Sequence, residues 1–321
     1  RNNIMEAEDS VILFNDCHFT KIITLNHGLM FDIKSSTVEI LNCFFSDNKI
    51  TMTDAIFFFT NSQVNIEGFS IEKCLFFDTL HYALAFSGCN AGIEDLNFTS
   101  NFSNQSLGTI ILMDDTSLKV ANCNSINNHT FNNFRFLNCY SSNAKIYNCV
   151  YKGNQASGDE SGNIVFSDEA NLDISNCLMV DNSYDYYSAS VNNYQDNGET
   201  SNVNISNCTY VADSENVDFH PFLRTVKANV NIANSIVQAS SDNIFMTQES
   251  SVTVDYSNVN WPYHIYTGTG NINADPLFAD PVNGDYHLKS IAGRFDPATG
   301  EWVMDNVSSP CIDAGNPGDW I

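Results

Sequence analysis

A six-residue motif recurs about every 27 residues along this chain, in the order apolar, any, apolar, any, Asn, Cys. Complete copies lie at residues 38–43, 118–123, 144–149, 172–177 and 203–208. Degenerate copies fill the intervals and bring the total to ten, with the last position of the motif occupied by Cys17, Cys74, Leu96, Ser235 and Ser257. A fixed period of about 20 to 50 residues is characteristic of a solenoid, in which each repeat stacks on its neighbour.

Each repeat is predicted to consist of short strands. The motif alternates apolar and variable residues with a period of two, which indicates a strand with one buried face. A second alternating run precedes several copies, and a third follows the Cys; Asn, Asp, Ser and Gly separate them. The pattern therefore predicts an all-β fold, a parallel β-helix of about ten coils. The right-handed form is expected, because parallel crossovers are right-handed almost without exception.

The repeat divides the chain into a long rod and a short tail. It runs through at least residues 10–260, so residues 1–270 are predicted to form one β-helix and residues 271–321 a C-terminal capping segment. An open end of a β-helix exposes unpaired backbone and core side chains, which favours aggregation. The apolar residues expected to cover the last coil are Phe278, Tyr286, Leu288, Trp302 and Ile312.

The Asn and Cys positions of the motif are expected to stack from coil to coil. The Asn lies where the strand bends, and stacked Asn side chains can bond to one another and to turn backbone. Seven of the ten cysteines fall in the Cys position by this count. Stacked thiols have nearly parallel Cβ directions, which disfavours disulfides. Cys123, Cys149, Cys177 and Cys208 are therefore predicted to be buried, reduced and slow to react.

The charge of the chain excludes several classes of partner. Thirteen Lys and Arg stand against 38 Asp and Glu, which gives a formal net charge of −25. Such a surface repels nucleic acid and anionic membranes, and it opposes unaided binding of polyuronates. No run of 18 apolar residues is present, so no membrane span is predicted.

Three strings in the C-terminal segment carry a family resemblance. They are Asp-Pro-Leu-Phe at 275–278, Gly-Asp-Tyr-His-Leu at 284–288 and Ser-Pro-Cys-Ile-Asp-Ala-Gly at 309–315. The segment resembles the closing segment of secreted bacterial right-handed β-helix proteins of the pectate-lyase-like superfold. The resemblance implies an extracellular or cell-surface location, and it implies no activity, because this superfold carries lyases, hydrolases, adhesins and stalks. Related segments continue past the glycine, so we expect a truncated segment and either a monomer or part of a longer surface protein.

Three acidic residues of the segment could bind a metal. Asp275, Asp280 and Asp285 stand at five-residue intervals and offer the hard oxygen ligands that Ca²⁺ prefers. Asp-Pro and Gly-Asp sequences also form turns that need no metal. The turn interpretation is favoured, so no cofactor is predicted and Ca²⁺ is the alternative.

Carboxylates recur at one position ahead of the motif. Asp114, Asp168 and Glu199 stand four residues before its first apolar residue, and Asp115, Glu169 and Glu249 stand three before it. Stacking at about 4.8 Å per coil would separate Asp168 from Glu199 by one coil and Asp114 from Asp168 by two. Those spacings bracket the geometries of retaining and inverting glycoside hydrolases. The alternative is a solvent-exposed turn in which Asp and Glu are common.

Two lysines form a second candidate for catalysis. Lys119 and Lys145 share one position of adjacent motifs and should point outward from the same strand position. Lyase chemistry uses a Lys or Arg as the proton acceptor. Solvated strand lysines are the simpler interpretation.

Aromatic residues in long coils are the stronger signal for binding. Tyr184, Tyr186, Tyr187 and Tyr194 lie in a 31-residue coil rich in Asn and Ser, and Trp261 and Tyr263 lie near the last copy. Exposed rings beside Asn and Asp suit stacking on sugars and bonding to their hydroxyls. The alternative is that these rings cover their own loops.

The sequence thus predicts a secreted or cell-surface β-helix that presents loops for adhesion or carbohydrate binding, without strong catalysis. A polysaccharide lyase or glycoside hydrolase is the first alternative, and a structural stalk is the second. A recessed polar groove on the outside of the coils would favour an enzyme, and a flat face would favour an adhesin or stalk.

Overall fold

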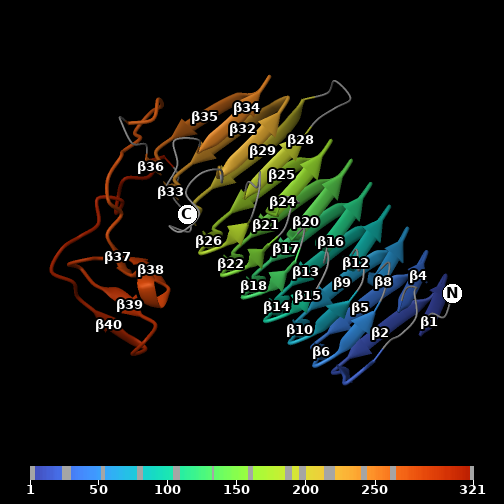
Figure 1. The fold of residues 1–321 in the computed structure, drawn as a ribbon. Coiled ribbons are helices and arrows are strands. Elements are labelled where there is room, and N and C mark those ends of the chain that lie inside the picture. Colours follow the sequence, from blue (N-terminus) through green and yellow to red (C-terminus); the bar gives the residue numbers. More distant parts are fainter. Residues whose placement is uncertain are drawn as a thin grey trace.

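The computed structural model describes residues 4–23, 30–51, 55–77, 82–103, 109–131, 134–157, 162–184, 190–194, 200–212, 221–239, 244–260 and 265–318. These residues form a right-handed parallel β-helix with a C-terminal segment beside it (Figure 1). Three ten-stranded parallel sheets run the length of the rod, which confirms the predicted fold and coil number.

Sheets A and B form two sides of the rod. Sheet A consists of β1 (Met5–Glu8), β4 (Phe31–Lys34), β8 (Ala55–Thr60), β12 (Tyr82–Ser87), β16 (Thr109–Asp114), β20 (Arg135–Tyr140), β24 (Asn163–Asp168), β28 (Val191–Tyr194), β31 (Leu223–Val226) and β34 (Phe245–Gln248). Sheet B consists of β2 (Val11–Asn15), β5 (Thr37–Leu41), β9 (Gln63–Glu67), β13 (Asn90–Glu94), β17 (Ser117–Ala121), β21 (Asn143–Tyr147), β25 (Asn171–Ser175), β29 (Ser201–Ser206), β32 (Ala228–Ala233) and β35 (Ser251–Asp255).

The remaining sides have shorter strands. Sheet C consists of β3 (His18–Thr20), β6 (Phe44–Ser46), β10 (Ser70–Glu72), β14 (Asn97–Thr99), β18 (Asn124–Ile126), β22 (Val150–Lys152), β26 (Leu178–Val180), β30 (Thr209–Val211), β33 (Ile236–Gln238) and β36 (Asn258–Val259). The six-stranded sheet D consists of β7 (Lys49–Thr51), β11 (Leu75–Phe77), β15 (Phe102–Ser103), β19 (His129–Thr130), β23 (Gln155–Ala156) and β27 (Ser183–Tyr184).

The Asn of the motif makes the turn from sheet B to sheet C. Asn42, Asn122, Asn148 and Asn176 have φ values of 51°, 53°, 55° and 52°, in the left-handed region that Asn tolerates better than most residues. Backbone conformation is therefore the main reason for Asn at this position. Stacking adds a smaller contribution, for example the bond of 3.2 Å from Asn148 Nδ2 to Asn122 Oδ1.

A second, buried row of asparagines lies at the turn from sheet C to sheet D, and the sequence interpretation missed it. Asn101 N donates to Asn128 Oδ1 at 3.0 Å, and Asn128 N donates to Asn154 Oδ1 at 3.2 Å. Each side-chain amide also donates to a strand carbonyl of the preceding coil, as Asn128 Nδ2 does to Phe98 O at 2.8 Å. The row consists of Asn48, Asn101, Asn128, Asn154 and Asn182, with Cys74 in the place of one Asn.

The position of Cys74 corrects the predicted register. Strand β9 pairs with β5 so that Val64 lies beside Val38 and Ile66 beside Ile40. The Cys position of this coil is therefore occupied by Phe69, and the motif had been assigned five residues too late in the chain. Six cysteines, not seven, occupy the position, and the spacing becomes more even.

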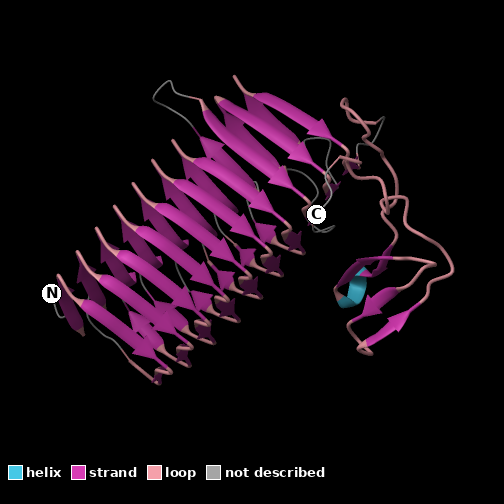
Figure 2. Cartoon of the chain, turned by 180° about the vertical axis from the view of Figure 1, so that it is seen from behind, coloured by secondary structure: helices cyan, strands magenta, loops and turns pink. Residues whose placement is uncertain are grey.

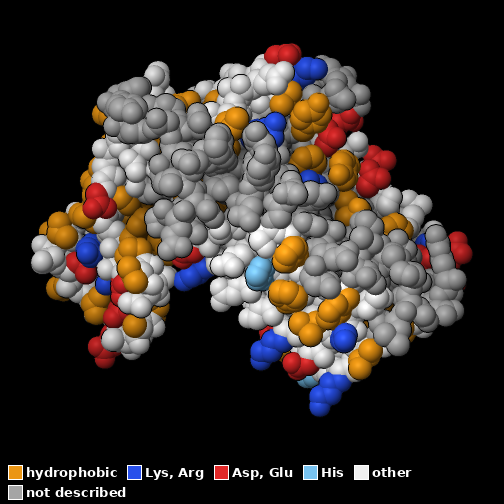
Figure 3. Space-filling view, in the orientation of Figure 1, with side chains coloured by type: hydrophobic (Ala, Val, Ile, Leu, Met, Phe, Trp, Pro, Cys, Tyr) orange, Lys and Arg blue, Asp and Glu red, His pale blue; other side chains and the backbone are white. Residues whose placement is uncertain are grey.

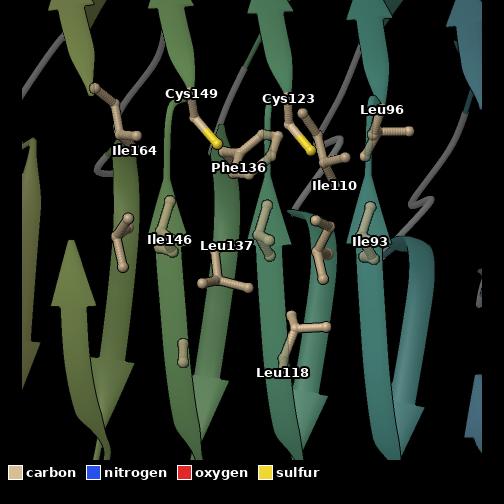
Figure 4. Packing of buried hydrophobic residues seen from close by; sticks show 14 of the residues in the cluster. Ile93, Leu96, Ile110, Leu118, Cys123, Phe136, Leu137, Ile146, Cys149 and Ile164 are labelled. Carbon is tan, nitrogen blue, oxygen red and sulfur yellow. The ribbon is translucent and has the colours of Figure 1, made fainter. Parts of the chain in front are cut away.

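The core is continuous and apolar (Figure 4). Ile93, Leu118, Ile146 and the sulfurs of Cys123 and Cys149 point into it, as predicted. The five complete motifs all lie in sheet B, the last four on adjacent strands, which confirms that they share one stacked sheet. All ten cysteines are free, and eight of them are buried.

The chain after the last coil does cap the rod, but with different residues from those predicted. Residues 265–272 add a partial layer, in which Ile272 pairs in parallel with Asn258 and Asn271 Nδ2 donates to Val254 O at 2.7 Å. The ring of Tyr266 packs on Phe245 with centroids 5.0 Å apart. Of the predicted cover residues, Leu288 lies near the turn of the last coil, whereas Trp302 is 68% exposed.

The C-terminal segment, defined here as residues 273–318, folds back along the side of the rod (Figures 2 and 3). It contains two antiparallel hairpins, β37 (Phe278–Asp280) with β38 (Asp285–Leu288) and β39 (Arg294–Asp296) with β40 (Glu301–Val303), and the 3-10 helix η1 (Pro281–Asn283). Tyr286 donates its hydroxyl to Asp181 Oδ1 at 2.7 Å, three coils back from the end. Asn316 N donates to Asn234 Oδ1 at 2.7 Å.

Candidate functional site

One column of side chains on the outer face of sheet A carries the strongest candidate site. Strand pairing places Asp114 beside Tyr140, Tyr140 beside Asp168, and Asp168 beside Tyr194. These four residues end consecutive strands of coils five to eight, and we call them the sheet A column. Tyr194 is 41% exposed, Asp114 is exposed, and the other two are half-buried.

A group of polar and aromatic side chains holds the column in place. The Arg135 guanidinium lies over the Phe166 ring, 4.3 Å from its centroid. The Phe166 ring lies 6.2 Å from that of Tyr140, whose hydroxyl accepts a bond of 3.4 Å from Asn138 Nδ2. Contacts on both sides thus order the Tyr140 ring. Sheet A therefore presents two mutually packed aromatic rings, Phe166 and Tyr140, beside the carboxylates of the column.

The structure brings together some of the predicted carboxylates and separates others. Asp114 and Asp168 share the column, as predicted, but Tyr140 lies between them. Two coils correspond to roughly 10 Å along the rod, near the upper end of the separation of about 6.5–9.5 Å between the carboxyl groups of inverting glycosidases. The spacing is too wide for a retaining pair, whose carboxyl groups are about 5–5.5 Å apart.

Glu199 does not follow Asp168 in this column, because Tyr194 occupies that position in the next coil. Residues 195–199 lie outside the described residues, between β28 and β29. Tyr194 stands nine positions before the first apolar residue of its motif, Val203, whereas Asp168 stands four before Leu172. Counting back four positions from Val203 therefore gives Glu199 instead of Tyr194. The other acidic row, Asp115, Glu169 and Glu249, forms the left-handed turn between sheets A and B, with φ values of 45°, 55° and 50°.

The two lysines are adjacent, as predicted, but they carry no sign of activation. Lys119 pairs with Lys145 in register, and both side chains point outward from sheet B. The Lys119 ammonium lies over the Tyr147 ring, 5.1 Å from its centroid. The hydroxyl of Tyr147 raises the pKa of Lys119, which disfavours the neutral amine that a base requires.

Most of the predicted aromatic binding residues lie outside the described residues. These are Tyr186, Tyr187, Trp261 and Tyr263, together with the side chain of Tyr184. Tyr194 is described and belongs to the sheet A column. The sequence interpretation missed Tyr140 and Phe166. Both residues occupy outward positions of the second alternating run. An aromatic residue at a position that is normally polar could have identified them.

Of the three predicted calcium ligands, Asp280 and Asp285 are paired across the β37–β38 hairpin, whereas Asp275 lies before β37. Asp275 Oδ1 accepts from Leu277 N, and Asp280 Oδ1 accepts from Asn283 N. Asp285 is 9% exposed and pairs with Arg294 at 3.0 Å. Each carboxylate thus serves a turn or an ion pair. Over the described ranges, no three His, Cys, Asp or Glu residues are arranged to hold a metal ion.

The three strings of the C-terminal segment have structural roles. Arg294 bridges Asp285 and Asp305, each at 3.0 Å, and so ties the two hairpins together. Cys311 accepts a bond of 3.1 Å from Asn258 Nδ2 in the last coil. In the part of the chain that the structure describes, no helix is long and apolar enough to cross a membrane.

A family model described as "Disaggregatase related" matches residues 129–315. The chain belongs to this family. The match spans the later coils, the C-terminal segment and three of the four residues of the sheet A column. No curated protein matches the chain in sequence.

Several solved structures show a distant likeness. A tailspike protein from Acinetobacter baumannii bacteriophage Fri1, described as a capsular polysaccharide depolymerase, is 9% identical over 90% of this chain and 69% of its own, with a TM-score of 0.33. An alginate lyase of family PL6 is 8% identical over 96% of this chain and 56% of its own, with a TM-score of 0.19. The fluoroquinolone resistance protein QnrB1 is 11% identical over 59% of this chain and 94% of its own, with a TM-score of 0.16. Scores this low carry no argument about activity.

Proposed function

We propose that this protein binds a glycan chain along the outer face of sheet A, without cleaving it. The observation that carries the proposal is the alternation of carboxylate and phenol in the sheet A column, beside the ordered Phe166 ring. Aromatic faces pack on the C–H faces of sugars, and carboxylates accept bonds from their hydroxyls. Because each coil adds one group, the carboxylate–phenol pair recurs after two coils, and an extended ligand lying along the rod would meet this pair of contacts twice.

Binding fits the geometry better than catalysis does. The column offers Asp114 and Asp168 at two-coil spacing, and the pKa of Lys119 is raised. A hydrolase or lyase using Asp168 is the alternative. Its second catalytic group would be Asp114, two coils away, or a residue outside those described.

The proposed location is extracellular or at the cell surface, where glycan chains are available. The support is the resemblance of the C-terminal strings to those of secreted β-helix proteins. The proposed glycan is neutral or weakly charged, because a net charge of −25 opposes the approach of a polyanion.

The test is binding of the intact protein to a panel of neutral and acidic polysaccharides, followed by affinity electrophoresis of variants. Tyr194→Ala and Phe166→Ala should each weaken retention, by about 1 kcal/mol for each lost ring contact. Tyr147→Ala removes a comparable ring from sheet B and should leave retention unchanged. Equal effects of Tyr147→Ala, or no retention by any polysaccharide, would refute the proposal.

The same panel separates binding from cleavage. Reducing ends and unsaturated uronates should not accumulate with the wild-type protein. Their release, and its loss in Asp168→Asn, would replace the binding proposal with an enzyme that uses this carboxylate.

A further inference from the structure

A cleft lies where the C-terminal segment meets the rod, away from sheet A. It has a volume of about 340 Å³ and opens between the sheet B to sheet C turns of the last three coils and residues 311–316. Asn207, Asn234 and Tyr256 contribute from the turns, and Leu288 and Asn316 contribute from the segment. Ligand sites favour such joints between structural units, and the volume lies at the lower end of their usual range.

The chemistry of the lining is unusual for this chain. None of the residues that line the cleft is an Asp, Glu, Lys or Arg, although the chain carries 51 such residues. The polar lining consists of amides and hydroxyls, and Ile236, Ile272 and Leu288 supply apolar surface. A charged ligand would find no counter-ion among these side chains.

Some polar groups of the lining are hydrogen-bonded to other described residues of the protein, and others are not. Asn234 Oδ1 accepts from Asn316 N, and Asn258 bonds to Ala274 and Cys311. By contrast, the Asn207 amide, the Thr209 hydroxyl and the Tyr256 hydroxyl have no bonding partner among the described residues. Asn207 is exposed, and the other two are half-buried.

Two of the unbonded groups, those of Tyr256 and Asn207, are held in position by the surrounding backbone. A Cβ placed on Gly270 would lie 2.5 Å from the Tyr256 ring, so the glycine backbone packs directly against one face of the ring. Asn207 is fixed by its left-handed turn, with φ of 53°. The Asn207 amide can both donate and accept hydrogen bonds, and it lies in the same cleft as the Thr209 and Tyr256 hydroxyls and the apolar side chains. These groups together suit the hydroxyls and the C–H face of a sugar.

We propose that this cleft binds a neutral saccharide, one or two sugar units in size, independently of the sheet A column. The joint would then serve as a second glycan site, and it exists only while the C-terminal segment is docked on the rod.

The proposal is tested by ligand-observed NMR on the intact protein, with glucose, galactose, N-acetylglucosamine and, as a charged counterpart, glucuronate. At least one neutral sugar should show saturation transfer, and glucuronate should show none. In the double variant with Asn207→Gly and Tyr256→Phe, the affinity should fall roughly tenfold, as expected for two lost neutral hydrogen bonds. Glycine keeps the left-handed turn, and phenylalanine keeps the ring contact with Gly270.

Matched variants separate this site from the first. Asn176→Gly makes the same change at the equivalent turn one coil earlier, outside the cleft, and should leave sugar binding intact. Thermal melting checks that each variant is folded. Absence of any neutral sugar signal, an equal response to glucuronate, or unchanged affinity in the double variant would overturn the proposal. Loss of binding in Tyr194→Ala alone would place the sugar at the sheet A column instead.

Discussion

The rod and the C-terminal segment are stabilised in different ways. In the rod, each coil repeats the hydrogen bonds and apolar contacts of its neighbour. The described residues of the segment contribute nothing to this hydrophobic core, and the segment depends on single polar contacts, with Arg294 between Asp285 and Asp305 at its centre. A repeated structure can spread its stability over many similar interfaces, whereas the segment concentrates its stability in a few bonds.

The largest effect on solubility should appear when the C-terminal region is shortened to two different lengths. A chain that ends at Asn273 keeps the layer of residues 265–272 and should remain a soluble, folded rod. A chain that ends at Asn260 loses this layer and exposes the last coil, so it should aggregate. Light scattering and circular dichroism measure both outcomes. If the two truncations behave alike, the cover of the rod has been assigned to the wrong residues.

Thiol labelling compares the two regions within one molecule. Cys17, near the open end, and Cys311, in the segment, are partly exposed, and the other eight cysteines are buried. Burial raises the pKa of the Cys74 thiol to about 11 and raises that of Cys139 as well, so few thiolates form at neutral pH. Cys17 should react promptly, and Cys311 should react more slowly because burial raises the pKa of its thiol as well. The other eight should react only after denaturant is added. Mass spectrometry of labelled peptides identifies the sites, and prompt labelling of Cys123 or Cys149 would contradict the buried stack.

The buried asparagine row should contribute more than the exposed asparagines of sheet B. Asn128→Ala removes the bond to Phe98 O and leaves Asn101 N without its acceptor, so unfolding should become easier by about 2–4 kcal/mol. Asn143→Ala removes an exposed amide whose oxygen accepts a bond of 3.0 Å from Asn171 Nδ2, and it should cost less than about 0.5 kcal/mol. Urea unfolding compares the two variants, and equal costs would show that the row is not a source of stability.

The smallest effect is expected at the contact between the segment and the rod. Tyr286→Phe removes one exposed bond to Asp181, about 1 kcal/mol, which should raise cleavage of the segment by protease roughly fivefold. Tyr147→Phe, on sheet B, is the control and should change nothing. Unchanged cleavage in Tyr286→Phe would mean that Cys311 and Asn316 hold the segment without this bond.

The sequence predictions agree with the structure wherever the repeat keeps a constant length. The five complete motifs lie in sheet B as predicted, and Lys119 lies beside Lys145, because equal coil lengths keep equivalent residues in register. Errors occur where that regularity ends. The motif count selects Cys74 because Phe69 replaces the Cys of that coil, and it selects Glu199 because nine positions, not four, separate Tyr194 from the first apolar residue of the next motif.

The sequence by itself determined the rod, its core and the inward thiols, since a period of about 27 residues with internal alternation allows few other folds. Only the tertiary structure decided which outward side chains meet on sheet A and where the C-terminal segment docks. The bond between Tyr286 and Asp181 joins residues 105 positions apart, and the cleft at the joint depends on contacts of that kind. No local pattern encodes such pairs, because the side chains become neighbours only after the coils have stacked.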